Sequence, residues 1–109
     1  KSIEHWNMDY SYSGDSSYIP NQVLDDGEFT YFRFNPDLEL PAIFLVDEDG
    51  EESLINYHIQ GKYVVVQRLG KQFTLRNGNK VSCVFNENPD YLKNDSTMKK
   101  AAPRKDDGQ

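Results

Sequence analysis

The side chains able to do nucleophilic or metal chemistry are few in this 109-residue chain, which has one cysteine, Cys83, and two histidines, His5 and His58. A cysteine and a histidine can form a catalytic dyad, and both residue types bind zinc. A structural zinc site needs four ligands, however, and these three residues lie far apart in the sequence. Cys83 alternates with Val81 and Phe85, so we expect it on the core side of a strand, with an intermolecular disulfide as the alternative. The sequence therefore predicts no metal site, no cofactor and no enzyme.

An acid-rich stretch, residues 47–52, has the charge density of a calcium-binding loop. Aligned on Gly50, the calcium-loop pattern requires an acid at position 45 and a glutamate at position 56, where this chain has Leu45 and Asn56. Acidic segments that contain a glycine are also typical of tight turns between strands. We therefore expect a solvated hairpin turn here.

The charge of the chain is unevenly distributed. The net charge is −6, from 18 acids and 12 bases. Five acids and five bases lie in residues 87–109, which leaves 13 acids against 7 bases in residues 1–86. An acidic body repels phosphate groups, so the composition argues against direct binding of nucleic acid.

Short apolar runs separated by turn residues fill residues 1–86, and none keeps a helical period. In residues 6–12 apolar and polar side chains alternate at every position, which is typical of a half-buried strand. The pattern predicts an all-β fold, an antiparallel β-sandwich of about seven to nine strands built from residues 1–86. Residues 87–109 are predicted to form a polar, largely disordered tail. The expected strands include 6–12, 28–34, 42–46, 53–60, 63–69, 72–76 and 80–85.

Two of these strands carry specific expectations. In residues 53–60, Ile55, Tyr57 and Ile59 share one face, which leaves His58 directed toward solvent. Residues 28–34 read EFTYFRF and are aromatic on both faces. One face, with Thr30, Phe32 and Phe34, is expected to meet the core, and the other, with Phe29, Tyr31 and Arg33, a partner or a loop of the same chain. The stem of Arg33 is expected on aromatic surface, with its head paired to a carboxylate or carbonyl.

The order of motifs resembles a known family over about residues 22–86. The matching segments are Asp25-Asp26-Gly27, residues 29–34 and 41–44, Asp49-Gly50-Glu51-Glu52, Ile55-Asn56-Tyr57, residues 61–66 and Leu75-Arg76. Together they resemble the C-terminal domain of the TrbG/CagX/TraO-type subunits of type IV secretion systems, a family that includes the ninth VirB protein. The resemblance implies a β-sandwich in the outer-membrane core complex of a bacterial conjugation or secretion channel.

That resemblance also implies partners and a location. The domain would lie at the periplasmic face of the outer membrane, within a homo-oligomeric ring. It would bind a small outer-membrane lipoprotein of the seventh VirB type and pack beside the channel-forming subunit of the tenth VirB type. Because the chain begins at Lys1 and nothing in it resembles a signal peptide, we expect a piece of a longer exported protein.

Surplus aromatic side chains indicate where such a partner could bind. The chain has seven tyrosines, six phenylalanines and one tryptophan, more than a core of this size requires. The strand expected over residues 6–12 is the best candidate for an open sheet edge that a peptide could complete. The alternative is a carbohydrate- or ligand-binding sandwich, which would need a flat, exposed aromatic platform. The residues predicted to contact the partner are Trp6, Tyr10, Tyr12, Tyr18, Phe29 and Tyr31.

Overall fold

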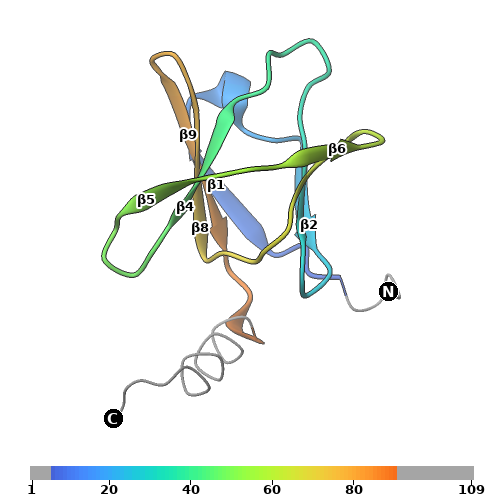
Figure 1. The fold of residues 1–109 in the computed structure, drawn as a ribbon, viewed down its shortest axis with the longest axis vertical. Helices are drawn as coiled ribbons and strands as arrows, with labels where there is room; N and C mark the ends of the chain where they lie inside the picture. Colours follow the sequence, from blue (N-terminus) through green and yellow to red (C-terminus); the bar gives the residue numbers. More distant parts are fainter. Residues whose placement is uncertain (1–5, 91–109) are drawn as a thin grey trace.

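The computed structural model of the chain describes residues 6–90, and these residues form two antiparallel sheets, as the sequence predicts (Figure 1). One short 3-10 helix, η2 (Ser16–Tyr18), joins the first two strands. The strands are β1 (Tyr10–Gly14), β2 (Gln22–Asp25), β3 (Thr30–Arg33), β4 (Ala42–Val46), β5 (Glu52–Ile55), β6 (His58–Gln60), β7 (Tyr63–Val66), β8 (Gln72–Asn77) and β9 (Lys80–Asn86).

The two sheets enclose one apolar core. The five-stranded sheet has the order β1-β9-β8-β4-β5, and the four-stranded sheet has the order β2-β3-β7-β6. Alternate side chains of the inner strands meet between the sheets, as sandwich geometry requires. The strands that end each sheet are therefore β1 and β5 in one and β2 and β6 in the other. The buried core consists of Val23, Phe32, Phe34, Ile43, Val64, Val66, Phe73, Leu75 and Val84.

The aromatic strand divides its faces as expected. Thr30 and Phe32 are fully buried and Phe34 nearly so, and the ring of Phe32 packs edge-on against Phe73 at 5.3 Å. Tyr31 and Arg33 lie on the other face and are half-buried. The hydrophobic pattern of β3 thus encodes both a core face and an outer face.

The prediction of one strand over residues 53–60 is wrong. β5 ends at Ile55 in the five-stranded sheet, and β6 begins at His58 in the four-stranded sheet, so the chain crosses between sheets at residues 56–57 (Figure 1). Tyr57 anchors the crossing, because its hydroxyl donates to the Pro41 carbonyl at 3.1 Å. The crossing leaves Ile59 55% exposed instead of in the core, while His58 is exposed as predicted.

The expected orientation of β9 is also wrong. Ser82, Val84 and Asn86 face the interior, whereas Cys83 is half-buried on the outer face of the sheet with a free thiol. Hydrogen bonds explain the inversion, since they remove the cost of burying the polar side chains. The Ser82 hydroxyl donates to the Tyr18 carbonyl at 2.8 Å, and the Asn86 amide donates to the Gly70 carbonyl at 3.4 Å.

The N-terminal segment departs from strict alternation. β1 begins at Tyr10, four residues later than expected, and Met8 is 53% exposed. Before β1 the chain belongs to the other sheet, because Asn7 pairs with Asp25 at the end of β2 through two backbone hydrogen bonds of 2.9 Å. The segment therefore runs from one sheet to the other.

Between residues 6 and 90 the chain has no helix long and apolar enough to cross a membrane. The predicted disordered tail falls mostly outside the described residues, and the last strand ends at Asn86.

Gly14 offers a test of how tightly β1 is held. Both Gly14 and Gly50 have positive φ, at 103° and 84°, but only Gly14 is crowded, since a Cβ there would lie 2.5 Å from the Val81 carbonyl oxygen. Gly50→Ala should cost only the backbone strain, about 1 kcal/mol. Gly14→Ala should cost at least about 1 kcal/mol more in urea unfolding, because the backbone must also shift. Equal losses for the two variants would contradict the close approach.

Candidate partner-binding site

The outer edge of β1 has backbone groups that β9 does not use. In the β1–β9 pair, Glu87 N–H donates to the Asp9 carbonyl and Asp15 N–H donates to the Val81 carbonyl, both at 2.8 Å. Hydrogen-bonded positions alternate along an antiparallel pair, so Ser11 and Ser13 also bond β9. The N–H and C=O groups of Tyr12 therefore point away from β9, toward the open side of the sheet. The prediction of an edge strand in this region is confirmed, with bounds shifted to residues 10–14.

Tyr10 links this edge to the other sheet. Its hydroxyl donates to Asp25 Oδ2 at 2.5 Å, and Asn7 Nδ2 donates to the same oxygen at 2.9 Å. The backbone N–H of Gly27 donates to Asp25 Oδ1 at 3.0 Å, so the buried carboxylate has donors on both oxygens. Burial and the neighbouring Asp25 raise the pKa of Tyr10 well above its usual range. The hydroxyl of Tyr10 is thus engaged within the fold, and Tyr10 as a contact for a partner stays a prediction.

Tyr12 also lies between the same two edges. Burial raises the pKa of Tyr12, and a hydrogen bond from the Val23 backbone partly offsets that shift. Because Val23 lies on β2, the side chain of Tyr12 reaches from the edge of one sheet to the edge of the other. Its ring packs against the core, which leaves its backbone as the group available to an added strand.

Tyr18 lies away from the β1 edge, in η2, and is only 4% exposed. Its hydroxyl donates to the Glu39 carbonyl at 2.9 Å and accepts from Asn77 Nδ2 at 2.7 Å. This residue therefore joins the loop before β4 to the end of β8. As a contact for a partner Tyr18 stays a prediction, and the structure gives it little free surface.

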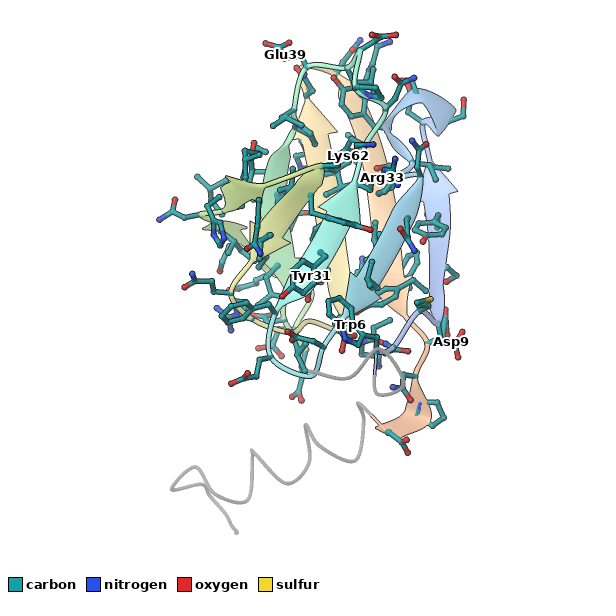
Figure 2. All side chains as sticks on the ribbon, turned by 90° about the vertical axis from the view of Figure 1, so that its right-hand side faces the viewer. Trp6, Asp9, Tyr31, Arg33, Glu39 and Lys62 are labelled. Carbon is teal, nitrogen blue, oxygen red and sulfur yellow. The ribbon has the colours of Figure 1, made fainter. Side chains whose placement is uncertain are left out.

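The remaining predicted residues lie on the outer face of the four-stranded sheet. The ring of Trp6 contacts Tyr31 at a centroid distance of 5.0 Å, and Tyr31 contacts Tyr63 at 6.1 Å. Figure 2 shows Trp6 and Tyr31 together on this face. Phe29 is half-buried in the β2–β3 turn, where its backbone N–H donates to Asp26 Oδ1. The six predicted residues therefore do not form one site. Tyr10 and Tyr12 lie on β1, Trp6, Phe29 and Tyr31 lie on or beside the outer face of the four-stranded sheet, and Tyr18 is interior.

The aromatic row is not a flat platform. Trp6 and Tyr31 are inclined by 36°, and Tyr31 and Tyr63 are nearly perpendicular at 86°. Stacking on sugar rings requires exposed, near-coplanar faces, whereas these rings pack on one another. Within residues 6–90 the buried indole N–H of Trp6 has no hydrogen-bond acceptor.

Sequence reasoning missed a groove at the end of the sandwich near β6. The groove has a volume of about 440 Å³. Arg33 lines it, and within residues 6–90 no carboxylate or carbonyl pairs with its guanidinium, so the predicted partner of its head is not found there. The one signal in the sequence was the alternation that placed Arg33 on the outer face. The groove is lined by Arg33, Phe34, Asn35, Pro36, Leu38, Leu40, Ile59, Gly61, Lys62, Tyr63 and Val64.

The residues considered for chemistry do not come together. Cys83 lies in the five-stranded sheet and His58 at the edge of the four-stranded sheet, while His5 lies outside the described residues. Between residues 6 and 90 no group of three histidine, cysteine or acidic side chains could hold a metal ion. In the acidic turn, Asp47 Oδ1 instead accepts the backbone N–H groups of Asp49 and Glu51, each at 2.9 Å.

Fold and site together define a β-sandwich domain with an open sheet edge, a class of domain that commonly binds peptides by strand addition. Residues 1–87 match the CagX family of conjugal transfer proteins, and the chain belongs to this family.

Relatives from several bacteria agree. The chain is 46% identical over 81 residues to a type IV secretion system protein virB9 of Bartonella quintana, and the aligned region covers 74% of this chain and 28% of the relative. It is 44% identical over 92 residues to virB9 of Brucella suis, covering 79% and 32% of the two chains. It is 36% identical over 83 residues to protein virB9 of Agrobacterium fabrum, covering 76% and 28%. The chain thus spans about a third or less of these relatives and is similar to a type IV secretion component.

The link between Tyr10 and Asp25 predicts a specific loss of stability in alkali. Tyrosine in an unfolded chain releases its proton near pH 10. The raised pKa of folded Tyr10 means that the native state keeps this proton when the unfolded state has lost it. The free energy of unfolding should therefore fall as the pH rises above about 10. Denaturant unfolding of Tyr10→Phe between pH 8 and pH 11 should show a shallower fall than the unaltered chain, and parallel curves would contradict this assignment.

Proposed function

We propose that the domain is a non-enzymatic assembly module of the outer-membrane core complex of a type IV secretion system, and that it binds a small lipoprotein subunit through the β1 edge. Its similarity to virB9 proteins supports the placement in a secretion system. In this proposal the domain lies at the periplasmic face of the outer membrane. It packs beside the channel-forming subunit of the tenth VirB type and repeats in a homo-oligomeric ring.

One observation carries the binding mode, namely the outward-facing backbone of Tyr12 on an edge strand. An extended peptide of the lipoprotein, the seventh VirB type of subunit, would add to β1 by main-chain hydrogen bonds. The segment that carries Trp6, whose ring packs on Tyr31, precedes this edge and would supply side-chain contacts. Tyrosine and tryptophan suit such contacts because they bring large area with few rotatable bonds.

The role of the domain in transport is structural on this proposal. The acidic balance of residues 1–86 disfavours direct contact with a nucleic acid backbone, so any DNA cargo would be handled by other subunits. A carbohydrate-binding role is the second candidate function, and it receives less support because the outer aromatic rings are inclined to one another.

Co-purification tests the proposal at the level of the complex. The domain within its full-length protein is isolated from detergent-solubilised membranes, and the proteins that accompany it are identified by mass spectrometry. We expect a small lipoprotein in stoichiometric amount. Isolation of the secretion complex without any such lipoprotein would contradict the proposal.

Substitution of Tyr12 tests the binding mode. Tyr12→Pro removes the N–H that points away from β9, which an edge strand tolerates within its own sheet. Tyr12→Ala is the matched control, because it also removes the ring but keeps the N–H. In titrations with a synthetic peptide from the lipoprotein, Tyr12→Pro should bind about tenfold more weakly than Tyr12→Ala.

Amide spectra of both Tyr12 variants establish that the sandwich is intact before binding is compared. The peptide should shift amide signals of residues 10–14 most strongly. Equal affinities of the two variants, or shifts confined to β7 and β8, would show that the peptide binds elsewhere.

A further inference from the structure

The groove near β6 has an apolar floor that residues 6–90 leave uncovered. Phe34 and Val64 form its buried part and belong to the core, whereas Leu40 is 40% exposed and Ile59 is 55% exposed at its rim. Large aliphatic side chains so far out of the core lose favourable burial unless something covers them. The groove lies beside edge strand β6, whereas the β1 edge lies beside β2 at the other end of the four-stranded sheet.

Two cations stand at the same groove. Arg33 from β3 and Lys62 from the β6–β7 turn both line it, and Figure 2 shows their side chains close together on this face. Neither makes an ion pair within residues 6–90. Residues 1–86 contain 13 acids and 7 bases, so two neighbouring cations that no carboxylate pairs with make this groove locally positive on an acidic domain. They suit an occupant that brings an apolar side chain together with negative charge.

This chain contains such an element in its β4–β5 hairpin. Asp49 and Glu51 are exposed at the turn, and Leu54 on β5 is 66% exposed, more than any other large hydrophobic side chain in residues 6–90. Asp47 holds the turn in place through its bonds to the Asp49 and Glu51 N–H groups, so the acids are presented on a formed structure. The hairpin and the β6–β7 turn lie on opposite sides of the molecule in Figure 1. The hairpin therefore cannot reach the groove of its own copy.

We propose that the groove at β6 receives the β4–β5 hairpin of a second copy of this chain. Leu54 of one copy covers Ile59 and Leu40 of the next, and the acids of the turn meet Arg33 and Lys62. The two surfaces differ, so the contact is heterologous and repeats from copy to copy, as a ring requires. This inference rests on the ring assembly in the proposed function and names the surfaces that would build it.

Complementary variants of the 109-residue chain test the contact. Ile59→Asp disables the groove and Leu54→Asp disables the hairpin, and both residues are exposed enough to be changed without loss of the fold. At low salt and about 1 mM protein, where a millimolar contact is populated, sedimentation velocity of the unaltered chain should show association that grows with concentration. Each variant alone should be monomeric. An equimolar mixture should form dimers and nothing larger, because only one intact groove and one intact hairpin can meet.

Charge reversal gives a second arm. Lys62→Glu and Glu51→Lys should each weaken association by about tenfold or more, and the chain that carries both changes should recover it. Met8→Asp is the matched control, since Met8 is 53% exposed but lies outside both surfaces, and it should associate like the unaltered chain.

A sedimentation coefficient of the unaltered chain that does not change up to about 1 mM would overturn the inference. So would association that survives Ile59→Asp and Leu54→Asp in one chain. Binding of the lipoprotein peptide is measured separately on these variants, and both should keep it. If the unaltered chain binds the peptide but does not self-associate, only the proposed ring surfaces are contradicted. If it does not bind the peptide, the proposed function is contradicted.

Discussion

The carboxylate of Asp25 is the group on which the arrangement of this sandwich depends. It is 4% exposed at the end of β2, and Asn7, Tyr10 and Gly27 supply its hydrogen-bond donors. Burying a carboxylate without hydrogen-bond donors would cost several kcal/mol. The total stability of a small domain is only about 5–15 kcal/mol, so this cost would remove much of it. The chain must therefore place Asn7 beside β2 and Tyr10 at the start of β1. This requirement carries the N-terminal segment from one sheet to the other, to the point where β1 begins as the last strand of its sheet.

The two long sides of the sandwich are closed in different ways, and each candidate surface follows from its closure. On one side Tyr10 and Tyr12 reach from β1 to β2, so side chains span the gap and the backbone of β1 stays available. On the other side the chain itself crosses from β5 to β6. That crossing displaces Ile59 from the core and opens the groove with Arg33 and Lys62. Both surfaces are consequences of how unpaired sheet edges are handled.

Much of the fold could be predicted because alternation in a strand reports burial directly. The division of β3 into a face with Phe32 and a face with Tyr31 was readable, and so was the acidic turn after β4. The errors arose where polar side chains are buried or the chain changes sheets. In β9 the interior side chains include Ser82 and Asn86, whose hydrogen bonds replace water, so hydrophobicity assigned Cys83 to the wrong face. Nothing local in residues 53–60 marked the point of crossing.

By itself the sequence determined the class of fold, most strands of the core and the family, because these depend on short-range pattern and on the order of motifs, but it did not predict β2, which brings Val23 into the core. It also located an edge strand near its beginning. The tertiary structure alone decided where that edge begins, that Tyr18 is interior, and that Arg33 and Lys62 share a groove with Ile59. These features depend on contacts between residues far apart in the chain, such as Asn7 with Asp25 and Tyr18 with Glu39, and a local pattern holds no information about such distances.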